Sequence, residues 1–255
     1  MLCEGSTCRI ISAAHPKGKI MQSTVILVHG AFAESSSWHA VAERLTTHGH
    51  RVIAYANPLR SIAYDAAGLT ALVRTVDGPV LLVGHSYGGA VITNVPADAG
   101  QIIGLVYVAG FALDAGESPG VAASLAPGGT LGETLQPVPL PDGGADLYIA
   151  QDKYHQQFCA DLPEADAALL AISQRPIVDA ALGENSGESP LWRSVPSWFI
   201  FGDQDRNIPV GAQQIMAQRA DAKRVIEIAG ASHVVGISHP AETADLILQA
   251  AGSAS

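Results

Sequence analysis

Short apolar runs alternate with amphipathic segments along most of the chain. Six runs rich in aliphatic residues are typical of strands buried on both faces, and they cover 24–29, 51–56, 79–84, 102–110, 196–202 and 224–230. Apolar residues at helical spacing predict helices at 37–49, 61–76, 87–97, near 209–220 and near 240–251. This alternation predicts an α/β fold with a mostly parallel sheet flanked by helices and joined by right-handed crossovers.

Residues that favour helix ends support the first predicted helix, 37–49. Ser37 is expected to be its N-cap, and Gly49 follows its last residue. The second helix, 61–76, is predicted from the spacing of its apolar residues alone.

The alternation stops between the fourth and fifth strands, at about 111–195. This segment is rich in proline and glycine, and it contains one clear helix, at 163–174, with Pro163 in the first turn. We expect this insertion to form a helical cap over the carboxyl ends of the strands, where open α/β sheets bind ligands. The expected organisation is a poorly ordered tail over 1–22 and one domain over 23–255.

Composition narrows the function classes. Of 255 residues, 48% are hydrophobic and 15% charged, which is enough for a large core. The formal net charge of −10 disfavours binding to nucleic acid, and no apolar run reaches the roughly 18 residues of a membrane span. Three cysteines make no disulfide framework, and the first twenty residues lack the apolar stretch of a secretory signal, so we expect a cytoplasmic protein.

Four of the predicted strands are followed by residues with potential chemistry. A Gly-containing turn, 29–32, follows the first strand, Ser86 the third, Asp203 and Asp205 the fifth, and His233 the sixth. Because the carboxyl ends of parallel strands meet at one edge, these residues are expected to converge. A hydroxyl, a carboxylate and an imidazole in this chain order are the groups that acyl transfer requires.

The sequence GHSYG surrounds Ser86 and fits the G-x-S-x-G pattern of a nucleophile between a strand and a helix. Gly84 ends the apolar run of the third strand, and Tyr87 begins a helix-compatible stretch. GESPG also fits the pattern, but Ser118 follows no strand and the next residue, Pro119, has no N–H to stabilise an oxyanion. Ser86 is therefore the predicted nucleophile; the alternative is a Gly-rich turn with a capping serine.

The partners of Ser86 follow from the same layout. His233 is the predicted base, since it lies after the last strand. The acid is Asp203 or Asp205, which local chemistry does not separate, although Asp203 also suits a turn-forming role. The N–H groups of Tyr87 and Ala31 are predicted to form the oxyanion hole.

The pocket is less defined. Phe32, in the first turn, and His155, in the cap, are the residues predicted to contact substrate, while His29 and His85 are expected to shape the site turns. The sequence lacks G-x-G-x-x-G, P-loop and H-E-x-x-H motifs and a close Cys/His cluster, so we expect no cofactor and no metal. The expected partner is a small-molecule ester, with neither nucleic acid nor membrane; a homodimer is left open.

With these motifs in place, the chain resembles the α/β-hydrolase superfamily from about Thr24 to Ala251. The resemblance rests on VILVHGAF, VLLVGHSYGG, FGDQDRNIP and GASH in this order. It implies that the acid is Asp205, the second Asp of the G-x-x-D turn. The compact build, in which the domain begins directly at the strand before His29, Gly30 and Ala31, is similar to that of one branch of the superfamily. This branch holds small carboxylesterases, plant methyl esterases and hydroxynitrile lyases.

Within the resemblance, two sets of residues favour ester hydrolysis over the other activities of the superfamily. Lyases of that branch tend to carry Thr at the oxyanion turn and Lys after the histidine, where this chain has Ala31 and Val234. Ser86 departs from the Asp of haloalkane dehalogenases and epoxide hydrolases. The expected function is thus a serine esterase that cleaves small, fairly apolar carboxylic esters through an acyl-enzyme. The alternatives are lyase-like or cofactor-free perhydrolase activity on the same triad, or thioesterase activity.

Overall fold

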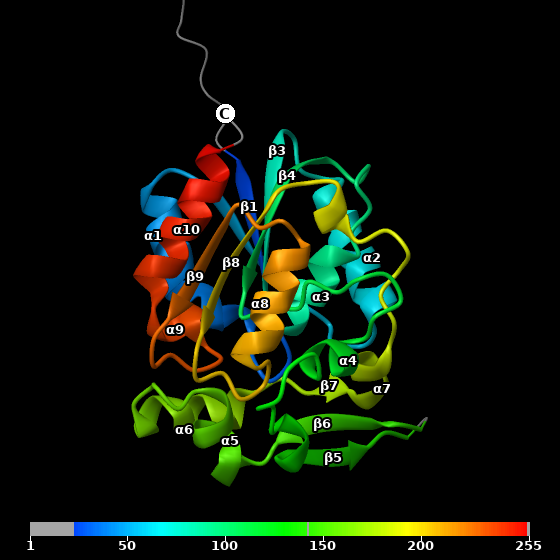
Figure 1. Ribbon diagram of the computed structural model, residues 1–255, viewed down its shortest axis with the longest axis vertical. Helices are drawn as coiled ribbons and strands as arrows, with labels where there is room; N and C mark the ends of the chain where they lie inside the picture. The colour runs from blue at the N-terminus through cyan, green and yellow to red at the C-terminus, as the bar shows by residue number, and fades with distance from the viewer. Residues whose placement is uncertain (1–22, 142, 254–255) are drawn as a thin grey trace, which may run out of the picture.

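A six-stranded parallel sheet forms the centre of the protein (Figure 1). The computed structural model describes residues 23–141 and 143–253; the predicted tail over 1–22 lies outside these ranges. The strand order is β2-β1-β3-β4-β8-β9. The strands are β1 (Thr24–Val28), β2 (Arg51–Tyr55), β3 (Pro79–His85), β4 (Gln101–Val108), β8 (Ser197–Gly202) and β9 (Arg224–Ile228). All six agree with the predicted runs to within two residues.

Helices cover both faces of this sheet (Figure 1). One layer contains α1 (His39–Thr47), α9 (Val235–Ser238) and α10 (Pro240–Gly252), and the other contains α2 (Ile62–Val73), α3 (Tyr87–Thr93) and α8 (Val210–Arg219). None of the helices within the described residues is long and apolar enough to cross a membrane.

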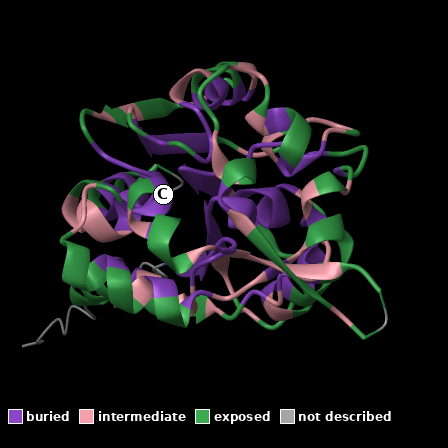
Figure 2. Cartoon of the chain, turned by 90° about the horizontal axis from the view of Figure 1, so that it is seen from below, coloured by how far each residue is buried: buried purple, intermediate pink, exposed green. Residues whose placement is uncertain are grey.

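Burial follows the position of each strand in the sheet. Every residue of β1 and β8 is buried, as the continuous apolar runs predict, whereas the edge strands β2 and β9 are largely exposed or half-buried. Figure 2 shows the buried residues gathered in the strands and on the helix faces that pack against them. The rigid sheet therefore fixes the positions of the turns that follow its central strands.

The cap joins β4 to β8 and lies beyond the carboxyl ends of the strands (Figure 1). It is not purely helical, which corrects the expectation from the sequence: β5, β6 and β7 form an antiparallel three-stranded sheet. The cap elements are α4 (Pro119–Ala123), η2 (Leu131–Glu133), β5 (Leu135–Pro139), β6 (Ala145–Ile149), α5 (Gln151–Phe158), α6 (Glu164–Ser173), β7 (Ile177–Val178), α7 (Asp179–Gly183) and η3 (Leu191–Arg193).

Two prolines explain why the sequence pattern did not predict the cap sheet. Pro137 and Pro139 lie in β5 and pair with Leu147 and Ala145 of β6. A proline cannot donate to a ladder, so such residues argue against an interior strand. They are tolerated here because β5 is an edge strand that pairs only with β6 among the described residues.

The start of the first helix also differs from the prediction. A short 3-10 turn, η1 (Ser35–Trp38), precedes α1, so the N-cap is Trp38 and not Ser37. The Ser37 hydroxyl instead donates to the carbonyl of Glu34 at 2.7 Å. Gly49 follows the helix at φ +85°, as expected of a residue that ends a helix.

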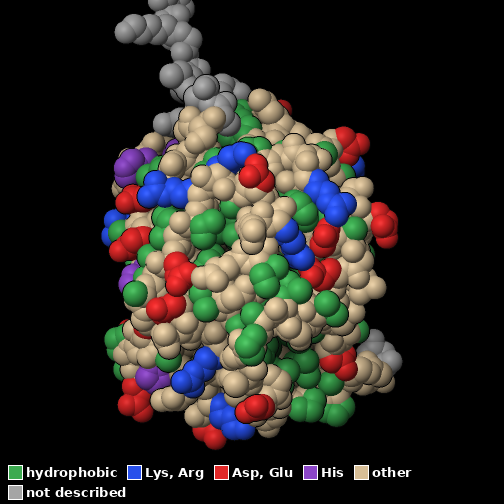
Figure 3. Space-filling view, in the orientation of Figure 1, with side chains coloured by type: hydrophobic (Ala, Val, Ile, Leu, Met, Phe, Trp, Pro, Cys, Tyr) green, Lys and Arg blue, Asp and Glu red, His purple; other side chains and the backbone are tan. Residues whose placement is uncertain are grey.

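The surface carries charge of both signs. On the face in Figure 3, acidic and basic side chains are interspersed, with hydrophobic side chains gathered toward the cap. The net charge of −10 therefore does not collect into one acidic field on this face.

Candidate active site

Ser86 lies at a sharp turn between β3 and α3. Its backbone has φ +53° and ψ −123°, a conformation that costs a residue with a side chain about 1–3 kcal/mol. The turn is held because the Ser86 N–H donates to the carbonyls of Val108 and Ala109, at 3.3 and 3.1 Å. The Ser86 carbonyl in turn accepts from the N–H groups of Gly89 and Phe111. Strain at Ser86 is thus maintained by bonds to the neighbouring strand and helix.

Two glycines allow this turn to close. A Cβ at Gly84 would lie 2.6 Å from the carbonyl carbon of Gly88. A Cβ at Gly30, in the turn after β1, would lie 2.6 Å from the Cβ of Ser86. Both distances are too short for any side chain, so the small residues around Ser86 are required by close backbone approach.

The structure brings His233 to Asp205. Nδ1 of His233 lies 2.7 Å from Oδ2 of Asp205, and both side chains are completely buried. Nε2 of His233 is also buried and has no hydrogen-bond partner among the described residues, Ser86 included. His233 therefore has one nitrogen held by a carboxylate and the other available to a group that approaches it.

Asp203 occupies a different environment. Its Oδ1 accepts a hydrogen bond from the N–H of Gly230 at 2.7 Å, which ties two turns together at the surface. Of the two acids that the local sequence left open, the structure places Asp205 against His233 and gives Asp203 a turn-forming contact.

The Asp205 carboxylate accepts three more hydrogen bonds. Oδ1 accepts from the N–H groups of Asn207 and Ile208, at 2.8 and 3.0 Å, and Oδ2 accepts from Nε2 of Gln213 at 3.0 Å. Gln213 is fully buried in α8 and was not identified from the sequence. The available signal was a glutamine on the helix face that otherwise buries Ala212, Met216 and Ala217.

Two further histidines shape the site. Nε2 of His85 donates to the carbonyl of His233 at 3.1 Å, and their rings lie 4.8 Å apart. Nδ1 of His29 donates to the carbonyl of Gly30, while its Nε2 accepts from the N–H of Asn57. Burial holds the pKa of His85 well below its usual value, with a further lowering from His233, and burial also lowers the pKa of His29. Both rings are therefore neutral near pH 7 and act through hydrogen bonds.

The turn after β1 is attached to the cap. The N–H of Phe32 donates to the carbonyl of Arg175 at 2.9 Å, and the Tyr154 hydroxyl donates to the carbonyl of Phe32 at 2.7 Å. Ala31 precedes Phe32 in this turn. Since Tyr87 is the first residue of α3, its N–H has no acceptor within that helix. Ala31 and Tyr87, whose N–H groups are the predicted oxyanion donors, line the same cavity as Ser86.

The side chain of Tyr87 has a separate partner. Its hydroxyl donates to Oδ2 of the buried Asp65 at 3.0 Å, and Asp65 also accepts from the N–H of Arg60. Burial raises the pKa of both Tyr87 and Asp65. This pair was not identified from the sequence, because a lone aspartate in a predicted helix gives no sign of its tertiary partner.

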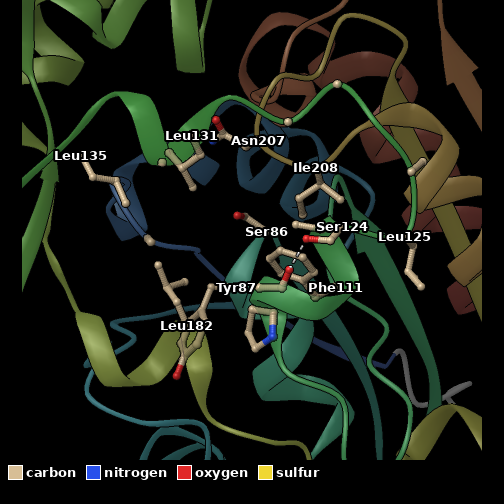
Figure 4. Close-up of a pocket in the computed structure, with 18 of the residues that line it drawn as sticks. Ser86, Tyr87, Phe111, Ser124, Leu125, Leu131, Leu135, Leu182, Asn207 and Ile208 are labelled. Carbon is tan, nitrogen blue, oxygen red and sulfur yellow. Dashed lines mark hydrogen bonds between the residues drawn. The ribbon is translucent and has the colours of Figure 1, made fainter.

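A cavity of about 690 Å³ opens over Ser86 beneath the cap (Figure 4). Among the described residues that line it, Tyr87 has the only ionisable side chain. The side chains that make its walls are mostly aliphatic or aromatic: Ala31, Phe32, Phe111, Pro119, Ala123, Leu125, Ala126, Pro127, Leu131, Leu135, Leu182 and Ile208. The hydroxyl of Ser86 therefore faces an apolar pocket.

Not every residue predicted for the site belongs to it. Phe32 lines the cavity as expected, but His155 does not. Nε2 of His155 donates to the carbonyl of Leu162 within the cap, so this ring stabilises a cap turn. Ser118 is the N-cap of α4, where its hydroxyl accepts from the N–H of Val121, and Pro119 is the first residue of that helix.

Comparisons with known proteins agree with this fold. Residues 25–246 match the model of the alpha/beta hydrolase family. The chain is 26% identical to Methylesterase 2 of Arabidopsis thaliana, over 88% of this chain and 94% of that protein. It is 27% identical to Norfluorocurarine synthase 2 of Strychnos sp, over 91% and 96%. The crystal structure of polyneuridine aldehyde esterase superposes with a TM-score of 0.74 at 21% identity, covering 89% and 98%.

The fold and the site define an α/β hydrolase with a cap inserted after the fourth strand. The chain belongs to the alpha/beta hydrolase family.

Proposed function

We propose that this protein is a serine esterase that cleaves small, apolar carboxylic esters through an acyl-enzyme on Ser86. The observation that carries the proposal is the buried pair of His233 and Asp205, which leaves Nε2 of His233 without a partner among the described residues. The strained turn at Ser86 supports the same proposal. The named esterases among the relatives of this chain favour the same chemistry.

The first half of the reaction forms the acyl-enzyme. Nε2 of His233 takes the proton of the Ser86 hydroxyl as Oγ attacks the ester carbonyl carbon. Asp205 holds the ring and stabilises the imidazolium. The N–H groups of Ala31 and Tyr87 stabilise the oxyanion, and losing one such donor costs about 2.7–4 kcal/mol of barrier. His233 then protonates the departing alcohol.

The second half releases the acid. A water molecule attacks the acyl carbonyl and gives its proton to Nε2 of His233. The bond between the acyl carbon and Oγ of Ser86 then breaks, His233 returns the proton to Oγ, and the free acid leaves. Nε2 has no partner in the substrate-free structure, and hydrogen bonds of this kind commonly tighten only when substrate binds. Apart from the ester and the water molecule, every group used belongs to the chain itself.

The pocket supports the choice of substrate. Its lining offers no Lys, Arg or His within the described residues, so an anionic acyl group or a coenzyme A phosphate would find no cation there. The apolar walls instead favour a neutral ester by burying its hydrocarbon surface.

Turnover of p-nitrophenyl esters tests this proposal. Wild type is expected to hydrolyse short esters, and Ser86→Ala to lower kcat by roughly 10⁴–10⁶ with the fold retained. A wild-type enzyme that turns over cyanohydrins, but not esters, would contradict the proposal.

A further inference from the structure

We propose that Asn207 is a specificity-determining residue whose Nδ2 donates a hydrogen bond to a neutral oxygen on the substrate, away from the scissile ester. The assignment rests on the proposed esterase function and deepens it. The preferred substrates are apolar esters that carry one further acceptor, such as an ether, ketone or hydroxyl oxygen.

The polar groups of the pocket are nearly all in use. The Ser124 hydroxyl donates to the carbonyl of Gly120 at 2.9 Å, and the Tyr87 hydroxyl donates to Asp65. Ser86 is the proposed nucleophile. Asn207 is the remaining polar side chain in the described lining, and Figure 4 shows it on the same side of the cavity as Leu131.

The orientation of the Asn207 amide follows from Gln157. One amide atom of Gln157 lies 3.0 Å from the carbonyl oxygen of Arg206, and a carbonyl can only accept, so that atom is Nε2. The hydroxyl of Thr130 then donates to Oε1 of Gln157 at 2.9 Å. The same Nε2 lies 2.7 Å from the Asn207 side chain, which must present Oδ1 to it.

With Oδ1 turned to Gln157, Nδ2 is the atom of Asn207 that faces the cavity. It has no acceptor among the described residues, although the residue is only 5% exposed. The N–H of Asn207 is bound to Asp205 and Gln157 is itself buried, so the side chain is anchored at both ends. A donor held this firmly in an apolar pocket is available to a ligand.

The free energy of substrate binding depends on whether the substrate offers an acceptor to this N–H group. An ester with an acceptor at the right place takes a hydrogen bond from Nδ2. An all-carbon ester excludes solvent from the pocket and leaves a buried N–H unpaired. The pocket therefore discriminates between two esters of equal size by the presence of one oxygen.

Matched ester pairs test the assignment. Two series of aliphatic esters are prepared, in which an ether oxygen replaces each methylene in turn, in the acyl chain in one series and in the alcohol in the other. The readout is the ratio of kcat/KM for the oxygen-containing ester to that for its all-carbon counterpart, measured by pH-stat. At the best position, we expect this ratio to be roughly three- to tenfold higher in wild type than in Asn207→Leu.

Two more variants make the result specific. Asn207→Asp keeps an acceptor for Gln157 but places oxygen where the donor was, so its ratio should fall below that of Asn207→Leu. Leu131→Ala changes an apolar wall nearby and should keep the wild-type ratio. A merely structural role for Asn207 would lower both esters of a pair equally and leave the ratio unchanged.

Unchanged ratios at every position, in an enzyme that hydrolyses the all-carbon esters, would overturn the role of Asn207 and leave the esterase proposal standing. Failure of wild type to hydrolyse any ester, together with no labelling of Ser86 by a fluorophosphonate, would contradict the proposed function and with it this assignment.

Discussion

The backbone of Ser86 shows how chemistry and stability oppose each other at a single residue. At φ +53° a side chain is strained, and glycine is the residue that adopts this region without penalty. We predict that Ser86→Gly raises the free energy of unfolding by about 1 kcal/mol relative to Ser86→Ala, while both variants are inactive. Urea denaturation of the two variants measures this difference. Equal stabilities would show that the turn is not strained.

The two aspartates of the GDQD turn differ in their contacts and should differ in function. Asp205 holds Nδ1 of His233, so Asp205→Asn is expected to lower kcat by roughly 10⁴. Asp203→Asn keeps an oxygen that can accept from Gly230 and should change kcat by less than about threefold. Steady-state kinetics on one ester measures both values. A mild Asp205→Asn with a severe Asp203→Asn would contradict the assignment of the acid.

The positions of individual residues were predictable from the sequence where a local motif or the strand order fixes them, whereas their roles stay predictions. Ser86 is marked by the glycines on either side, and His233 by its place after the last strand. The contacts of Gln213 with Asp205 and of Asn207 with Gln157 were not predicted, because only the folded chain creates them. His155 was misplaced for the same reason: its position in the cap does not show that it turns to Leu162.

At the scale of elements, helix α5 of the cap supports the turn that carries Ala31. The Tyr154 hydroxyl donates to the carbonyl of Phe32, and both groups are buried. We predict that Tyr154→Phe lowers the free energy of unfolding by about 1 kcal/mol and lowers kcat several-fold, because the oxyanion turn loses an anchor. Urea denaturation and ester kinetics check the two effects.

Tyr148 provides the matched control for that variant. It lies on β6, and its hydroxyl has no partner within the described residues, so Tyr148→Phe should change neither quantity. Equal behaviour of the two variants would indicate that the bond to Phe32 contributes nothing to the site.

The central strands were predictable because burial on both faces requires a continuous apolar run. The strands of the cap were harder to predict from the sequence. Its sheet contains the proline-bearing edge strand β5 and the two-residue strand β7, neither of which has a readable period. β5 pairs with the next strand in the chain, but its prolines obscure the strand pattern, and β7 is recognisable only by its pairing with Leu147, 30 residues before Ile177.

At the scale of the whole molecule, buried neutral histidines link stability to pH. Burial lowers the pKa of His85 well below 6.5, so between these values the unfolded chain binds more protons than the folded one. Stability from this group is present above about pH 6.5 and is lost as the pH falls toward the folded pKa, at up to about 1.4 kcal/mol per pH unit. His29 acts in the same direction.

We therefore predict that the free energy of unfolding of wild type falls as the pH is lowered from about 7.5 to 5.5, and that His85→Gln has a shallower slope. Glutamine can still donate to the carbonyl of His233, which makes it the conservative replacement. Urea denaturation across this range provides the slopes. Parallel slopes would mean that His85 is not held neutral by the fold.

The proposed chemistry depends most on Ser86 as a nucleophile activated by His233 and Asp205. Reaction with a fluorophosphonate probe, followed by mass spectrometry of the peptides, tests this directly. We predict one adduct, on Ser86, that is absent in Ser86→Ala and forms much more slowly in His233→Ala. An adduct on another residue such as Ser118, or ester hydrolysis that persists at the wild-type rate in Ser86→Ala, would contradict it.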